Sequence, residues 1–226
     1  MKLNVRFIAI LSVCGGLEIL IPQPAQAQLE RLYIKPDVGG TVTADTELKE
    51  FFGEPLAPGT KVKFDPGFRF GFAAGWNFTE WMSLEGETGY QGGWIKSITD
   101  ASRVDSLFEH VPVMANLRLE CPRCKWVTPY IGGGAGGSFT IIDANNITIG
   151  GTSMSGADSS FVFAYQAFGG IRFRIDDKMG IGVEYHYFHA DGAEWHAEFS
   201  TGTTSDRMRF GGTDTHSLSV AFQLRF

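Results

Sequence analysis

The sequence predicts an all-β protein, a transmembrane up-and-down antiparallel β-barrel of about eight strands. Three observations lead to this prediction: segments of alternating apolar and polar residues recur, short and long connections alternate between them, and the N-terminus has the features of a secretion signal. Beyond that signal, no stretch is apolar over the roughly 20 residues that a spanning helix needs. If the chain crosses a membrane, we therefore expect it to cross with strands.

Residues 1–27 are predicted to be a signal peptide that is removed. Lys2 and Arg6 form a basic region, an apolar core follows at 7–13, and small residues at 25–27 mark a cleavage site. An acidic residue and two prolines interrupt the run too early for a membrane anchor. A lipoprotein attached at Cys14 is the alternative, disfavoured because the preceding valine is not small. Residues 28–226 then form one outer-membrane β-barrel domain.

The predicted strands each show one apolar and one polar face. The last is the clearest, because Leu218, Val220 and Phe222 alternate with Ser217 and Ser219. Only the fifth strand, rich in glycine, leaves its faces ambiguous. The eight strands are expected at 32–42, 64–76, 82–94, 107–119, 127–140, 161–173, 179–188 and 217–226. The polar faces of the second to fourth, sixth and seventh strands carry Arg69, Glu85, Glu87, His110, Asn116, Arg118, Gln166, Arg172, Arg174, Glu184 and His186.

Connection lengths predict the topology. The second, fourth and sixth strands end in short turns, whereas long loops are expected at 43–63, 95–106, 141–160 and 189–215. Membrane barrels show this asymmetry, with short turns facing the periplasm and long loops facing outside. Aromatic residues are expected to form two girdles, Tyr33, Trp76, Trp81, Trp126, Tyr130 and Phe226 at the short turns and Phe64, Tyr90, Trp94, Phe108, Phe161 and Tyr187 at the long loops.

A secreted soluble barrel with its apolar face inward is the main alternative fold. In water, a barrel that instead closes on its charged face leaves a belt of Phe, Trp and Tyr exposed, far beyond the apolar patch that a soluble monomer tolerates. The opposite arrangement, with arginine facing lipid, costs about 2 to 4 kcal/mol per residue near the bilayer midplane. The apolar face is therefore expected to meet lipid and the polar face the lumen.

Several segments together resemble the OmpA/OmpX-like outer-membrane β-barrel family, often described as porin-like, over the whole length after the signal. They are residues 75–85 (GWNFTEWMSLE), 110–118 (HVPVMANLR), 128–134 (TPYIGGG), 169–176 (GGIRFRID), 183–187 (VEYHY) and the terminal strand. The resemblance implies location in the bacterial outer membrane, contact with its lipids, and a barrel-assembly machinery that reads the terminal strand through Phe222 and Phe226. The peptidoglycan-binding domain of longer relatives is not expected after Phe226. Fold alone assigns no activity.

The leading functional prediction is a structural or surface-interaction protein whose long loops meet an unknown external partner. About eight strands leave a lumen just filled by side chains. We expect that lumen to be closed by an ion network of Arg69, Glu85, Glu87, Arg172, Arg174 and Glu184, in which Arg69 meets both acidic residues of the third strand and the other two arginines meet Glu184. The alternative is a barrel that binds or transports a small solute. A lipid A-modifying enzyme is a weaker alternative.

The chemical motifs of the chain favour neither a cofactor nor catalysis. The glycine run at 132–137 matches the spacing of a dinucleotide loop, but no helix follows it, so a kinked barrel strand is expected. His186, His189 and His196 with nearby acids suggest a metal site, but histidines in loops are usually solvated. His216 and Ser217 are neighbours, so their side chains point to opposite faces of a strand. The net charge of −6 argues against a nucleic-acid partner.

Two cysteines, Cys121 and Cys124, remain after the signal is removed, in a short turn predicted to face the periplasm. In an oxidising compartment we expect them to form a disulfide. A redox role requires an electropositive pocket around the thiol, and a zinc site requires a second pair of ligands nearby. The sequence shows neither feature.

Overall fold

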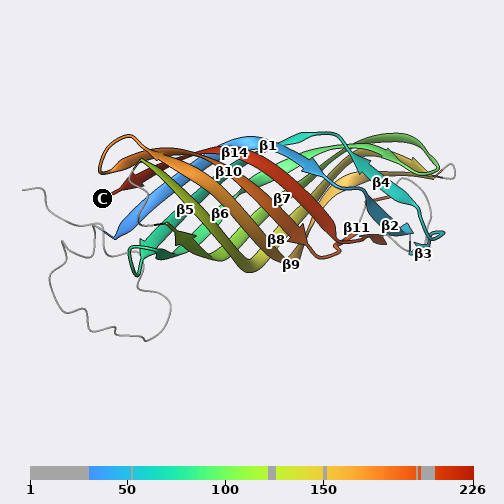
Figure 1. The fold of residues 1–226 in the computed structure, drawn as a ribbon. Helices are drawn as coiled ribbons and strands as arrows, with labels where there is room; N and C mark the ends of the chain where they lie inside the picture. The colour runs from blue at the N-terminus through green and yellow to red at the C-terminus, as the bar shows by residue number, and fades with distance from the viewer. Residues whose placement is uncertain (1–30, 52, 122–125, 150–151, 197, 200–206) are drawn as a thin grey trace, which may run out of the picture.

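The computed structural model describes residues 31–226 except 52, 122–125, 150–151, 197 and 200–206. The signal peptide predicted at 1–27 lies outside the described residues. All regular structure in the described part is β-strand, and it includes no helix long and apolar enough to span a membrane. Eight long strands close a barrel in which every neighbouring pair is antiparallel (Figure 1), as the sequence predicts.

The barrel strands follow one another around the wall in the order β6, β5, β1, β14, β10, β9, β8 and β7, and pairing of β7 with β6 closes it. The final strand thus lies beside the first, as in an up-and-down barrel. The eight strands are β1 (Leu32–Thr43), β5 (Gly67–Asn77), β6 (Met82–Ile98), β7 (Ala101–Glu120), β8 (Val127–Ile149), β9 (Thr152–Arg174), β10 (Met179–Ala190) and β14 (Thr213–Arg225).

The predicted faces are confirmed across most of the barrel. On β5, Phe70 is 53% exposed on the outside whereas its neighbour Arg69 is 2% exposed inside. The register places Phe70 beside Val38 of β1, and Val38 beside Val220 of β14, so exposed apolar side chains continue from strand to strand. Successive residues point to opposite sides of a strand. Because the register pairs outward apolar residues with outward apolar residues of the next strand, they form an apolar belt around the barrel.

Four strands extend far beyond the length of the other barrel strands. The β6, β7, β8 and β9 strands run for 17, 20, 23 and 23 residues, and together they carry the wall well past the ends of β5, β1, β14 and β10. The predicted loops at 95–106 and 141–160 are therefore wrong, since both are largely strand. Within 43–63 and 189–215 the structure likewise forms the short strands β2 (Thr46–Phe51), β3 (Glu54–Pro55), β4 (Lys61–Phe64), β11 (Glu194–His196), β12 (Glu198–Phe199) and β13 (Arg207–Phe210).

These short strands continue the wall above the barrel. The β4 strand pairs with β6, β2 with β4, β13 with β2 and β11 with β13. Separately, β12 pairs with β9. We call this extension of the sheet the upper tier. It consists of β2, β4, β11, β12 and β13 with the outer parts of β6 to β9. It lies at the end opposite the short turns and the C-terminus (Figure 1).

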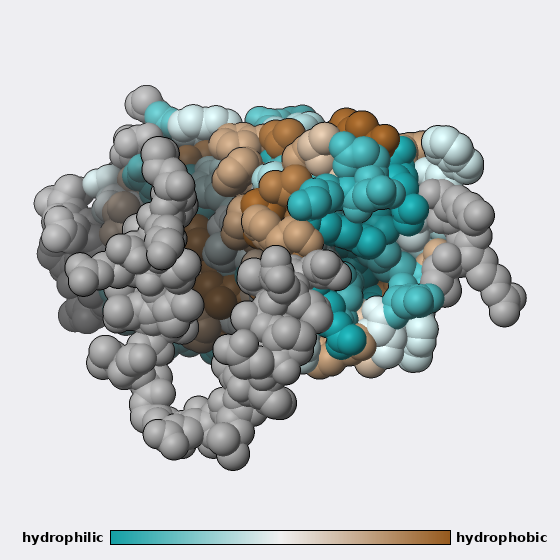
Figure 2. Space-filling model, turned by 90° about the vertical axis from the view of Figure 1, so that its left-hand side faces the viewer, coloured by the Kyte–Doolittle hydropathy of each residue, from teal (hydrophilic) through white to brown (hydrophobic). Residues whose placement is uncertain are grey.

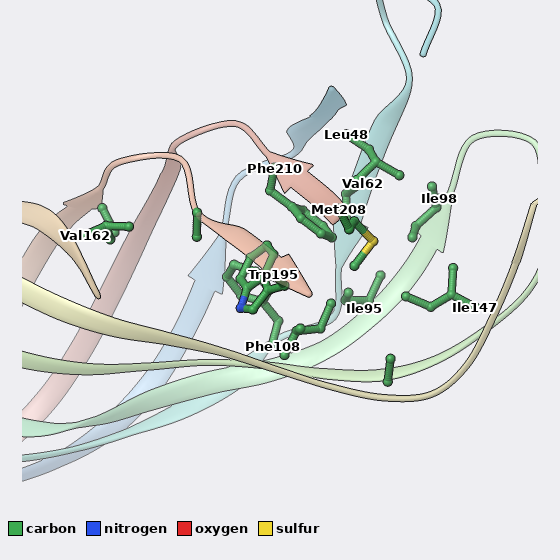
Figure 3. Close-up of a cluster of buried hydrophobic side chains, with 14 of the residues drawn as sticks. Leu48, Val62, Ile95, Ile98, Phe108, Ile147, Val162, Trp195, Met208 and Phe210 are labelled. Atoms are coloured by element: carbon green, nitrogen blue, oxygen red, sulfur yellow. The ribbon is translucent and has the colours of Figure 1, made fainter. Parts of the chain in front are cut away.

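The upper tier has the inverse polarity of the barrel. Its interior holds a cluster of buried apolar side chains (Figure 3) that includes Leu48, Val62, Ile95, Ile98, Phe108, Ile142, Ile147, Trp195, Met208 and Phe210. Outward-facing residues such as Lys61, Lys96 and Arg209 are polar and exposed. A wall surrounded by water must bury its apolar face inside, whereas a wall in lipid turns it outward. The change of polarity marks where the apolar belt ends.

The predicted aromatic girdles are only partly present. Trp76, Trp81 and Trp126 are exposed near the short turns, and Trp94 and Phe161 are exposed on the opposite side of the belt. Three members of the predicted girdles are instead buried, because their strand positions point inward: Tyr33 and Tyr130 lie in the lumen and Phe108 in the apolar cluster.

Two glycines in the run of six small residues of β8 leave space that side chains of the neighbouring strands occupy. A Cβ on Gly134 would lie 2.1 Å from the side-chain oxygen of Asn116, and one on Gly137 would lie 2.1 Å from the Phe161 ring. The first glycine therefore makes room for a polar side chain in the lumen. The second lets an aromatic ring of β9 cover the strand from outside.

The lumen as candidate functional site

Charged and amide side chains fill the middle of the lumen. The guanidinium of Arg69 donates from Nε to Oδ1 of Asp37 at 2.9 Å and forms an ion pair through Nη2 with Glu87. The other carboxylate oxygen of Glu87 accepts hydrogen bonds from Nδ2 of Asn116 at 2.6 Å and Nε2 of Gln166 at 2.7 Å. Five side chains from β1, β5, β6, β7 and β9 thus converge on one charged cluster.

A second cluster lies nearer the short turns. Glu85 accepts from Nη1 of Arg118 at 3.0 Å and from the hydroxyl of Tyr33 at 2.6 Å, and it lies 3.5 Å from Nζ of Lys35. The same ammonium donates to Glu184 at 2.8 Å. The Arg118 guanidinium also lies over the Tyr130 ring, 3.8 Å from its centre. Buried charges are retained when they are paired and hydrogen-bonded, and each charge of this cluster has an opposite partner, although Nε and Nη2 of Arg118 make no hydrogen bond among the described residues.

Glu120 lies among three arginines at the short-turn end of the lumen. Both of its oxygens accept from the two terminal nitrogens of Arg172 at 2.7 Å, which is the bidentate geometry that suits guanidinium and carboxylate. Nη2 of Arg118 lies 3.0 Å from the same carboxylate and Nη2 of Arg225 lies 3.5 Å away. The side-chain oxygen of Gln223 accepts from Arg172 at 2.6 Å.

The structure brings together some of the predicted network and rearranges the rest. Arg69 and Glu87 meet, but Glu85 contacts Arg118 and Lys35 instead of Arg69. Arg172 pairs with Glu120 and not with Glu184, whose cation is Lys35. Arg174 is exposed at the short-turn end. The predicted pairings assumed partners on adjacent strands, whereas Arg172 and Glu120 come from β9 and β7, with β8 between them.

Sequence reasoning missed Lys35 and Asp37 as members of the lumen. Both are buried, on the inward face of β1. Their signal was available, because they alternate with apolar Ile34 and Val38 and lie two and four residues beyond Tyr33. Glu120 was missed because it is the last residue of β7, at the margin of the predicted strand.

A histidine separates the charged lumen from the apolar cluster. The ring nitrogens of His110 lie 3.0 Å from the Thr140 hydroxyl and 3.1 Å from the Thr213 hydroxyl. The faces and edges of the same ring pack against Phe108 and Phe188, with ring centres 5.1 and 5.4 Å away. His110 therefore lies at the boundary between the polar lumen and the apolar cluster of the upper tier.

Trp195 is the central side chain of the upper tier. It is fully buried, packs edge-on against Phe210 with ring centres 4.7 Å apart, and donates from Nε1 to the carbonyl of Thr140 at 3.1 Å (Figure 3). On the outside of the tier, Arg207 forms an ion pair with Glu50, and the hydrogen bonds to that carboxylate raise the pKa of the guanidinium. Apolar packing and this half-buried ion pair hold β13 against β2 and β11 in the upper tier.

The histidines considered for a metal site point in different directions. His186 is buried in the lumen against Glu184, His189 contacts Asp214 on the outer face at 2.8 Å, and His196 is exposed on β11. Within the described residues, no three histidine, cysteine or acidic side chains are grouped as metal ligands. His216 is exposed outside and Ser217 is buried inside, so this pair is divided between the two faces as predicted.

The remaining predicted residues lie at the short-turn end or on the belt. Cys121 follows β7, and its predicted disulfide partner Cys124 lies outside the described residues, so the disulfide stays a prediction. Phe222 is exposed on the outer face of β14. Phe226 is exposed beyond the end of β14, where its backbone N–H donates to the carbonyl of Leu32 at 3.2 Å.

The closed eight-stranded barrel with an apolar exterior and a charged interior defines an integral membrane β-barrel. A family model described as "Outer membrane protein beta-barrel domain" matches residues 17–226, and the chain belongs to that family. The protein is accordingly located in the bacterial outer membrane. No curated protein matches the sequence.

Several solved structures share the fold. OprG from Pseudomonas aeruginosa superposes with a TM-score of 0.57 at 11% identity, covering 86% of this chain and 96% of that one. Neisserial surface protein A gives 0.52 at 13% identity, with 86% and 97% covered. The outer membrane protease OmpT from Escherichia coli gives 0.56 at 9% identity, with 86% and 96% covered. At these identities the likeness concerns the fold alone.

Proposed function

We propose that the protein is a closed outer-membrane barrel with a structural or surface-interaction role, in which the upper tier is the part offered to the outside. The observation that carries the proposal is the series of paired and packed side chains along the lumen, from the arginines around Glu120, through the clusters at Glu85 and Glu87, to the apolar core above His110. In this proposal the apolar belt contacts outer-membrane lipids, and the barrel-assembly machinery reads the terminal strand.

A small cavity below the upper tier supports a closed barrel. The cavity lined by Gln91, Phe108, His110 and Thr215 measures about 10 Å³. A cavity of that size holds about one water molecule and no solute. Opening a path past it requires separating ion pairs that are buried in the lumen, and such pairs are costly to break.

The upper tier supports the surface role. Its walls are extensions of barrel strands, and its interior is packed with side chains that are almost fully buried. A packed core holds a surface rigid, and a rigid surface binds a partner without losing much conformational entropy. The proposal includes no catalytic step: His186 faces the lumen, whereas His189 and His216 lie on the outer face of the wall near Asp214.

Two measurements test this proposal. Purified protein in nanodiscs is challenged with host matrix proteins, envelope components and lipid A, alongside Trp195→Ala, which loosens the upper tier, and Glu87→Gln, which alters the lumen. We expect saturable binding that Trp195→Ala weakens at least tenfold and Glu87→Gln leaves unchanged. Osmotic swelling of proteoliposomes is the second measurement. Swelling in small sugars or amino acids faster than protein-free liposomes contradicts the proposal and favours solute transport.

A further inference from the structure

An open cavity of about 420 Å³ lies at the short-turn end, which faces the periplasm in barrels of this type. Its lining includes four arginines and two acidic residues: Arg31, Arg172, Arg174, Arg225, Glu80 and Glu120. Figure 2 looks onto this end of the barrel and shows strongly hydrophilic residues gathered beside apolar ones. Binding cavities for small molecules typically begin at about 300 Å³, so the space is adequate for a small ligand.

Positive charge exceeds negative charge around this cavity. Glu120 is already shared by three guanidinium groups, those of Arg172, Arg118 and Arg225. One carboxylate balances one of these charges, and Arg118 has a second acidic partner in Glu85. The arginines at the mouth are therefore incompletely neutralised. In a recess partly screened from water, such an excess attracts an anion more strongly than it does on an open surface.

A buried hydrogen-bond donor next to the cavity is also unused. Gln223 is 3% exposed, and its side-chain oxygen accepts from Arg172. Its Nε2 has no hydrogen-bond partner among the described residues. A smaller recess of about 10 Å³ adjoins the main cavity, and its charged and polar lining residues are Arg172, Arg174, Arg225, Lys178, Asp176, Asp177 and Gln223. An unpaired buried donor costs about 1 to 3 kcal/mol, so this amide leaves one hydrogen bond still to be made at the margin of the mouth.

We infer that this periplasmic mouth is a binding site for a phosphate-bearing anion. Guanidinium groups present planar pairs of donors that match phosphate oxygens, and a phosphate group offers several such oxygens to the arginines around one space. The same chemistry is offered by free phosphate compounds of the periplasm and by phospholipid headgroups of the inner leaflet. The site is separate from the upper tier, so it adds to the proposed function and does not depend on it.

The first test is a calorimetric titration of the purified protein with inorganic pyrophosphate in uncharged detergent. Arg31→Gln combined with Arg174→Gln removes two mouth charges that take no part in the Glu120 pairs. The matched control is Arg209→Gln, an exposed arginine at the opposite end. We expect one saturable site in the wild type, at least tenfold weaker binding in the double variant, unchanged binding in the control, and affinity that falls as salt rises. The heat-dependent gel shift verifies that each variant is folded.

The second test separates the two sources of phosphate. Protein is reconstituted in phosphatidylcholine nanodiscs with or without phosphatidylglycerol, and co-purifying lipid is measured by native mass spectrometry. Retention of phosphatidylglycerol by the wild type but not by the double variant supports a headgroup ligand, whereas pyrophosphate binding without such retention supports a free one. The inference is overturned if neither phosphate probe binds saturably, or if the double variant binds both as tightly as Arg209→Gln does.

Discussion

Replacing Glu87 by alanine is the sharpest perturbation of the lumen. The carboxylate is 4% exposed and serves three donors, namely Arg69, Asn116 and Gln166. The substitution removes all three contacts at once. Arg69 keeps its hydrogen bond to Asp37, so its charge is not left entirely without a partner.

The expected cost follows from these contacts. Breaking a buried ion pair by removing one partner typically destabilises a protein by about 3 to 5 kcal/mol. The remaining Asp37 contact lowers that figure, while the two amides that lose their acceptor each raise it by about 1 kcal/mol or more. We therefore expect Glu87→Ala to lower the free energy of unfolding by about 3 to 4 kcal/mol, and the nearly isosteric Glu87→Gln by about half as much.

Urea unfolding in phospholipid vesicles, followed by tryptophan fluorescence and by the folded and unfolded bands on gels, measures this difference. Glu194→Ala is the control, because its pair with Arg209 is 45% and 51% exposed. An exposed pair contributes under about 1 kcal/mol. A loss for Glu87→Ala no greater than that for Glu194→Ala would refute the network described for the lumen.

Three further predictions concern the upper tier and the short-turn end. Trp195→Ala should destabilise the tier by about 3 to 5 kcal/mol, so that added protease cuts the outer hairpins while the barrel stays intact; an unchanged digestion pattern contradicts this. Deleting Phe226 should lower the amount of protein in outer membranes, although refolding in vitro should change little because the ring is 51% exposed. Normal amounts of the variant in outer membranes would contradict a role for Phe226 in assembly. Cys121 and Cys124 should both resist alkylation in unreduced mature protein, and Cys124→Ser should cost little stability because the closed loop is short; mass spectra with both thiols alkylated contradict the disulfide.

The sequence was sufficient to predict the barrel and the orientation of most strands. Alternation with a period of two is a local property, so Arg69, Glu85 and Phe222 were assigned to the correct face without any knowledge of their neighbours. The same rule failed for residues 141–149. There Ile142, Ala144 and Ile147 point inward and Asp143 points outward, the reverse of the polarity of the barrel strands, so the segment looked like a loop.

Ion-pair partners were harder to predict because the lumen joins strands that are not neighbours. The register places Gly134 of β8 directly between Asn116 of β7 and Gln166 of β9. Since the glycine has no side chain, the two amides reach across it and hydrogen-bond at 2.9 Å. Such contacts depend on register, on strand tilt and on which intervening residue is small. Alternation in a single strand contains none of this information.

Single-channel recording in planar bilayers tests the closed lumen most directly. In the proposed closed barrel, the side chains from Glu120 to the apolar core of the upper tier block a continuous water path, so the wild-type protein should show no stable conductance steps above the bare membrane in 1 M KCl. The same recording on Glu87→Ala and Trp195→Ala shows whether the lumen network or the upper tier contributes to the seal. A large, stable conductance from the wild type would contradict the closed barrel and favour a transport function.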